Sequence, residues 1–108
     1  MISMKKVALL ALAFLVLGSL SLAAAKSFTG TVSDSHCGAK HATASDDAAT
    51  CVEKCVSGGA QYVLVSKGKV YTLDPQEKFK GMGGKAVTVM GTVKGDTITA
   101  SSVTEKTN

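Results

Sequence analysis

Several residue types on which nucleic-acid-binding surfaces depend are missing from this chain. Its 108 residues include no tryptophan, only two tyrosines and three phenylalanines, and lysine as the sole basic residue apart from two histidines. The lysines are spread along the chain and form no long run. Nucleic-acid recognition depends on clustered basic side chains and on stacking aromatic rings. The composition therefore indicates a protein without a nucleic-acid partner.

A hydrophobic run long enough to span a membrane is also missing. A pair of lysines precedes the unbroken apolar run from Val7 to Leu17, whereas a bilayer-spanning helix needs about 20 apolar residues. Small residues at 23–25 then supply the pattern of a signal-peptidase cleavage site. We therefore predict that residues 1–25 are a signal peptide. The mature protein, starting at Lys26, is expected in the periplasm or outside the cell, with no membrane span.

The mature segment, residues 26–108, is long enough for a single domain. Removing Lys5 and Lys6 lowers the formal charge from +4 to +2, so the mature protein is only weakly basic. A chain of this size buries about 60–65% of its unfolded surface, and such small cores often gain stability from a disulfide or a metal ion. We predict one monomeric domain with a physical reason to carry such a cross-link.

Alternation of apolar and polar residues predicts five short strands in this segment. The predicted strands are residues 27–33, 61–66, 69–73, 85–93 and 97–103. Glycine-containing turns at 67–68 and 94–96 join the last four strands into two hairpins. Gly30 indicates a bulge or a close approach of another backbone. The apolar phase of the last strand slips between Ala100 and Val103, which indicates a second irregularity.

Two helical segments interrupt the strands. Ser45 is a good N-cap, two acidic residues follow it, and an apolar stripe of helical period runs as far as Gly58-Gly59, which predicts a helix over Asp46–Ser57. A shorter helical turn over residues 76–80 is expected to anchor Phe79 in the core. The order strand, helical insertion, hairpin, short helix, hairpin predicts a mainly β fold, a five-stranded OB-like barrel with its insertion at about residues 34–60. A five-stranded open roll or an SH3-like barrel, which has similar local signals, is the alternative.

Long stretches of the mature chain also match a known pattern. They are FTGTVSDSHCG followed by His41, then CVEKCV, GAQYVLV, GKVYTL and GKAVTVMGTVKGDTITASSV. On these stretches, which cover nearly all of the mature chain, the protein resembles a family of small exported bacterial proteins of unassigned function. The resemblance implies an OB-like β-barrel and implies no particular activity.

All three cysteines and both histidines lie in one segment, residues 34–55. The predicted metal ligands in it are Cys37, His41, Cys51 and Cys55. Three thiolates and one imidazole form the kind of closed tetrahedral set that holds structural zinc, and the same soft ligands suit Cu(I). The spacing, C-x3-H followed by C-x3-C, differs from that of common zinc fingers. His36 is an alternative to His41 as the imidazole ligand.

A disulfide is the alternative to a metal ion, since exported proteins fold in an oxidising compartment. A bridge from Cys37 to Cys51 or to Cys55 would close a loop of about 14–18 residues and contribute about 3 kcal/mol. A bridge between Cys51 and Cys55 is disfavoured because residues one helical turn apart are near the upper limit of Cα separation for a disulfide.

A third interpretation gives Cys37 a chemical role, with Asp34, His36 or His41 as a base that activates its thiol. The chain has neither a C-x-x-C motif nor a βαβ pattern around these residues. We therefore predict an exported, non-enzymatic domain, either metal-binding (Zn or Cu) or a disulfide-stapled binding module for a protein or small-molecule ligand. A thiol-dependent redox protein that uses Cys37 is the alternative.

Overall fold

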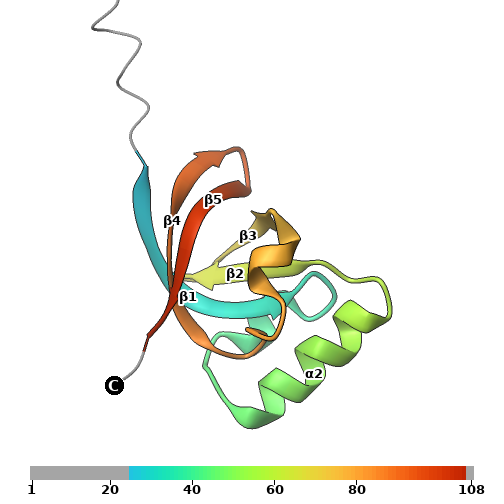
Figure 1. Cartoon of the computed structure of the whole chain (residues 1–108). Coiled ribbons are helices and arrows are strands. Elements are labelled where there is room, and N and C mark those ends of the chain that lie inside the picture. The colour runs from blue at the N-terminus through green and yellow to red at the C-terminus, as the bar shows by residue number, and fades with distance from the viewer. Residues whose placement is uncertain (1–24, 107–108) are drawn as a thin grey trace, which may run out of the picture.

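The computed structural model describes residues 25–106, which form a mainly β structure around five strands (Figure 1). The strands are β1 (Lys26–Asp34), β2 (Tyr62–Ser66), β3 (Lys69–Asp74), β4 (Ala86–Lys94) and β5 (Thr97–Glu105). Each predicted strand is present, and its ends differ from the prediction by at most two residues. The predicted signal peptide, except for Ala25, lies outside the described residues.

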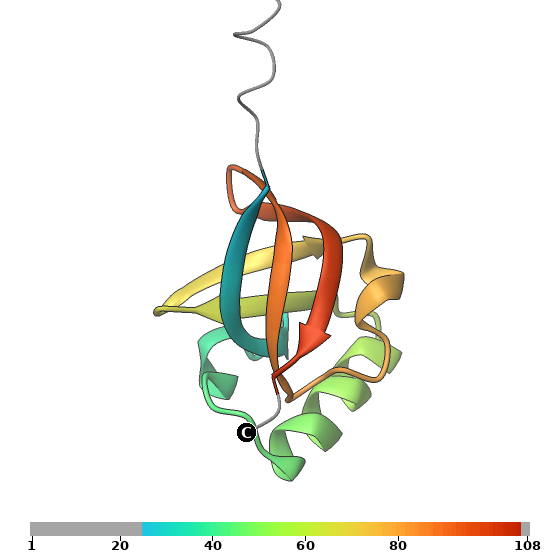
Figure 2. The same ribbon diagram turned by 60° about the vertical axis from the view of Figure 1, so that its left-hand side comes forward.

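The five strands are joined by hydrogen bonds into a closed ring, in the order β1-β2-β3-β5-β4. β1 pairs with β4 through its first half and with β2 through its second half, from Lys26 opposite Gly91 to Asp34 opposite Tyr62. The pairs β2-β3 and β4-β5 are antiparallel hairpins, and the parallel pair β3-β5 completes the ring. Figure 2 shows β1, β4 and β5 side by side in front of β2 and β3, which cross them.

The two predicted irregularities are confirmed. A Cβ atom on Gly30 would lie 2.2 Å from the carbonyl oxygen of Val65, so the backbone there approaches too closely for any side chain. The register of β4 against β5 shifts between Met90 and Gly91, which leaves Ser101 as an extra residue in β5. Bulges and close-approach glycines of this kind are typical of strands in strongly curved sheets.

The hydrophobic core is built from side chains of all five strands and of two helical segments. Its buried members are Val32, Val52, Tyr62, Leu64, Leu73, Phe79, Val87, Val89, Ile98 and Ala100. Phe79, at the end of the 3-10 helix η2 (Gln76–Phe79), is fully buried and is the largest such side chain, which confirms the predicted anchor. Val52 brings the helix α2 (Asp46–Ser57) into the same core.

Helix α2 has the predicted bounds and lies below one end of the ring (Figure 1). Its N-terminus is capped by Ser45, whose Oγ accepts a hydrogen bond of 3.0 Å from the backbone N–H of Ala48. Gly84, just before β4, presses against the first turns of the helix, because a Cβ there would lie 2.2 Å from the nitrogen of Ala49. The N–H of Ser45 donates to the oxygen of Gly84 at 3.1 Å. Among residues 25–106, no helix is long and apolar enough to cross a membrane.

Candidate metal centre

Buried side chains at the end of β1 hold the segment between β1 and α2 against the ring. The Ser33 hydroxyl donates to the oxygen of Gly38 at 2.8 Å, and the Thr31 hydroxyl donates to the oxygen of Ala42 at 3.0 Å. These contacts explain why residues 31–34 are all buried, whereas a half-buried strand would alternate. The 3-10 helix η1 (Gly38–His41) is therefore fixed in place, with Cys37 before its first residue and His41 at its last.

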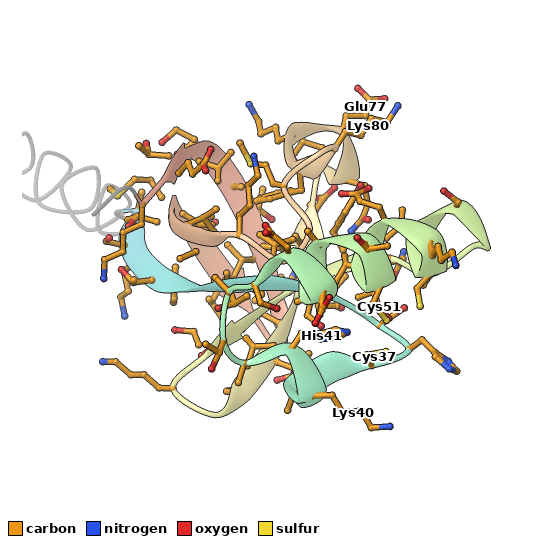
Figure 3. All side chains as sticks on the ribbon, turned by 90° about the horizontal axis from the view of Figure 1, so that it is seen from below. Cys37, Lys40, His41, Cys51, Glu77 and Lys80 are labelled. Carbon is orange, nitrogen blue, oxygen red and sulfur yellow. The ribbon has the colours of Figure 1, made fainter. Side chains whose placement is uncertain are left out.

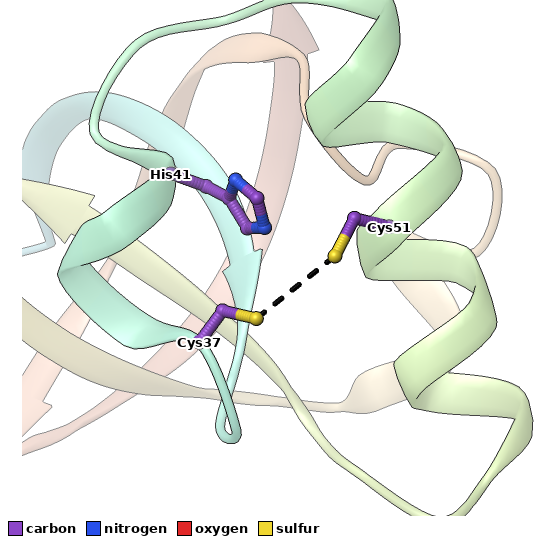
Figure 4. Close-up of side chains that lie close together, drawn as sticks. All are labelled: Cys37, His41 and Cys51. Carbon is purple, nitrogen blue, oxygen red and sulfur yellow. Dashed lines mark hydrogen bonds between the residues drawn. The ribbon is translucent and has the colours of Figure 1, made fainter.

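Three of the four predicted ligands meet between η1 and α2. The side-chain ligand atoms of Cys37, His41 and Cys51 all lie within 4.8 Å of one another. Figures 3 and 4 show the two sulfurs facing each other with the imidazole beside them, while Lys40 extends away from the group. The Sγ atoms of Cys37 and Cys51 are 4.0 Å apart, close to the separation of about 3.8 Å that zinc–sulfur bonds of about 2.3 Å give in a tetrahedron.

The fourth predicted ligand, Cys55, belongs to an adjoining group. Its sulfur, the Cys37 sulfur and a carboxylate oxygen of Asp34 also lie within 4.8 Å of one another. Cys37 is therefore common to both groups. Cys51 and Cys55 are half-buried, whereas Ala48 and Val52 on the same helical stripe are buried in the core. The two helix cysteines thus lie at the edge of the stripe that faces η1.

Two polar atoms in these groups lack a partner. Among residues 25–106, the only buried side-chain nitrogen or oxygen atoms without a hydrogen bond are His41 Nε2 and Asp34 Oδ2. The other carboxylate oxygen of Asp34 accepts bonds of 2.9 and 2.8 Å from the N–H groups of His36 and Cys37. A buried polar atom without a partner costs about 1–3 kcal/mol. A cation between these residues would remove that cost.

The electrostatic surroundings of the thiols also favour a cation. Partial burial, the neighbouring Cys51 thiol and the negative charge of Asp34 together raise the pKa of Cys37 to about 11. Burial and Asp34 likewise raise the pKa of Cys55. Without a metal, the side chains of Cys37 and Cys55 therefore remain neutral thiols near pH 7. An activated cysteine nucleophile needs the opposite shift, so these surroundings oppose the interpretation in which a base activates Cys37.

The structure also bears on the predicted disulfide and on the choice of imidazole ligand. All three cysteines are free thiols, and the 4.0 Å between the Cys37 and Cys51 sulfurs is about twice the disulfide bond length of about 2.05 Å. The predicted bridge from Cys37 to Cys51 or Cys55 is thus not the state of this structure. His36, the alternative imidazole ligand, belongs to neither group in the described residues. Asp34 was not predicted as a ligand, because a carboxylate next to a polar loop normally faces solvent.

Comparison with protein-family models, with curated proteins and with solved structures found no match to this chain. The geometry and chemistry of the two groups around Cys37 are therefore the basis for inferring a function.

Proposed function

We propose that this is an exported, non-enzymatic, monomeric protein that binds a soft metal ion, zinc or copper(I), through Cys37, His41 and Cys51, with Cys55 next to them. The observation that carries the proposal is the convergence of two thiols and one imidazole within 4.8 Å, with His41 Nε2 buried and unpartnered. Thiolate and imidazole are the ligands that zinc prefers in structural sites and that Cu(I) also accepts.

The scaffold supports the same proposal. We propose that the ring is an OB-like barrel, a fold whose loop between the first two strands is a common place for ligands. The centre lies in that loop, between β1 and β2. In the oxidising compartment expected for an exported protein, neighbouring thiols without a bound ion tend to form disulfides. A coordinated ion would keep the thiols of Cys37 and Cys51 reduced.

His41 provides the sharpest test, since His36 is a matched control five residues away in the same loop. We expect His41→Ala to weaken zinc binding at least about 100-fold, because loss of even an outer-shell partner typically costs 10–100-fold. His36→Ala is expected to have a zinc affinity within about threefold of that of the unaltered protein, since the His36 side chain supplies no ligand atom to the group of His41. Both variants are compared by chelator competition and native mass spectrometry on protein exported to the periplasm or medium.

Equal zinc affinity in the unaltered protein and His41→Ala would contradict the proposal, provided that circular dichroism shows both to be folded. A larger loss in His36→Ala than in His41→Ala would also contradict it. The same mass spectra report the mature N-terminus, which is expected at Lys26.

Zinc affinity is expected to rise with pH. The pKa of Cys37 lies at about 11, above its ordinary value of 9.0, so the metal-free protein holds this proton throughout the neutral range. Binding must displace it, and each displaced thiol proton strengthens binding about tenfold per pH unit below that pKa. Calorimetric titrations at pH 7, 8 and 9, in buffers of different ionisation enthalpy, measure both the affinity and the protons released. Affinity that is constant over this range would show that the thiols are not the ligands.

A thiol-dependent redox role for Cys37 is the second candidate, and the 4.0 Å between the Cys37 and Cys51 sulfurs favours it. Both sulfurs need to move by only about 1 Å each to reach disulfide distance. Peptide mapping of the exported protein, alkylated before reduction, distinguishes the two functions. A Cys37–Cys51 disulfide in a protein that does not bind added zinc or copper(I) would favour the redox role over the metal site.

A further inference from the structure

Asp34 is a carboxylate without a charge partner in the interior of the protein. Its side chain is 0% exposed, and its Oδ2 atom is buried without a hydrogen bond. The two ion pairs among the described residues, Lys69–Asp96 and Lys85–Glu105, do not include it. Buried carboxylates are normally paired with a cation or coordinate a metal. Asp34 Oδ1 is already used by two backbone N–H groups, so Oδ2 is the atom that remains for a ligand.

The thiols of Cys37 and Cys55 face this carboxylate. A carboxylate oxygen of Asp34 and both sulfurs lie within 4.8 Å of one another, which places three anionic ligands around a common point. The group shares only Cys37 with the group of His41 and Cys51. A thiolate has several lone pairs and can bind two metal ions at once, so occupation of one group does not exclude occupation of the other.

One member of this second group, Cys55, is open to a hollow at the surface. A hollow of about 460 Å³ is lined by Ser35, His36, Cys55, Gly58 and Ala60, so Cys55 forms part of its wall. A water molecule occupies about 30 Å³ in the liquid, so the hollow has room for an incoming ion together with water ligands. His36, which joins neither group, lies in the same wall. The hollow thus gives a cation a route to Cys55 that does not pass the group of His41.

Charge balance favours two divalent ions over one. With all ligands deprotonated, the three thiolates and Asp34 carry four negative charges in a partly buried space. Two Zn²⁺ ions neutralise all four charges, whereas two Cu⁺ ions leave two of them uncompensated. A single Zn²⁺ ion held by the thiolates of Cys37 and Cys51 would leave Cys55 protonated and the carboxylate of Asp34 without a counter-charge. Burying uncompensated charge is costly. The carboxylate ligand also favours zinc, since Cu(I) prefers sulfur and imidazole.

We propose that a second zinc ion binds Asp34, Cys37 and Cys55, and that the Cys37 thiolate bridges it to the zinc ion bound by His41 and Cys51. The inference rests on the proposed function, because the bridge requires an ion at the first group. It goes further in assigning Asp34 as a ligand and in giving the protein a capacity for two zinc ions.

The test is a zinc titration followed by native mass spectrometry, on the mature protein and on two variants. Asp34→Asn keeps an oxygen that can accept from the N–H groups of His36 and Cys37 but removes the negative charge. Cys55→Ser removes a different ligand of the same group and is informative if Asp34→Asn does not fold. We expect two zinc ions in the unaltered protein. Either folded variant is expected to keep one tightly bound zinc ion, with the second weakened at least about 100-fold.

The outcomes separate this inference from the proposed function. One zinc ion in the unaltered protein, with Asp34→Asn binding as tightly, overturns the second site and leaves the first intact. No zinc in the unaltered protein overturns both. Loss of both zinc ions in a folded Asp34→Asn or Cys55→Ser variant also overturns the assignment, because neither residue belongs to the group of His41.

Discussion

The Cys37→Ser variant is expected to bind no zinc at micromolar concentration, in either group. Cys37 is the one residue common to both groups. Its sulfur lies within 4.8 Å of a ligand atom of each of the other four residues. A serine hydroxyl is not deprotonated near neutral pH and is a poor ligand for zinc compared with a thiolate. Each group would keep two ligands, too few for a stable zinc site. The expected loss of affinity is at least about 1,000-fold, more than removal of an outer-shell partner costs.

The scaffold is expected to survive this substitution. The bond that Asp34 accepts from residue 37 comes from its backbone N–H, which serine retains. Cys37 is half-buried and lies outside the hydrophobic core. Native mass spectrometry and chelator competition measure the binding, with Cys55→Ser as the matched control that keeps one zinc ion. If Cys37→Ser binds zinc with the stoichiometry and affinity of the unaltered protein, then Cys37 is not a ligand in either group.

Gly84→Ala is expected to cause the largest loss of stability from a single added methyl group. Gly84 has a φ of +73°, and a Cβ there would lie 2.2 Å from the nitrogen and 2.5 Å from the Cα of Ala49. The clash is with backbone, which cannot rotate away, so α2 must shift from the ring. Backbone strain of about 1–2 kcal/mol adds to overpacking of about 1–3 kcal/mol. We expect a loss of about 2–5 kcal/mol.

Gly81→Ala is the control, because Gly81 has a similar φ of +78° but no atom within 4 Å of its added Cβ. It incurs the backbone strain alone, about 1–2 kcal/mol. At about 4–8 °C for each kcal/mol, thermal unfolding followed by circular dichroism should give Gly84→Ala the lower Tm by about 4–24 °C. Zinc affinity should fall in Gly84→Ala only, since α2 carries Cys51 and Cys55. Equal Tm values would mean that the contact with Ala49 is unimportant.

The elements of this fold were predictable because their signals are local. The bounds of α2 follow from the Ser45 cap, the apolar stripe and the glycines after Ser57. The strands follow from alternation, and the close approach at Gly30 from an unexplained glycine inside one of them. Each of these signals depends only on residues close by in the sequence. It can therefore be recognised without knowledge of the tertiary contacts.

The division of the centre into two groups was not predictable, because it depends on tertiary contacts. The sequence contains no sign that Ser33 and Thr31 turn their hydroxyls to the loop rather than to solvent. Those bonds set the position of η1 and so select His41 over His36. The burial of Asp34 has the same origin, since the loop and α2 cover a strand end that would otherwise be exposed. Cys51 and Cys55 also lie on the apolar stripe of α2 with Ala48 and Val52, a pattern that is equally typical of residues buried in the core.

The path of β1 around the ring has a consequence for the order of folding. Its first half pairs with β4, more than half the domain away in sequence, with Lys26 opposite Gly91. Pairing between distant segments is slowed by the entropy of closing the intervening chain. The ligands, in contrast, lie within residues 34–55, and such short loops close far faster than the ring. A metal ion bound as proposed would therefore gather the β1–α2 segment early, and closure of the ring would then be the slow step of folding.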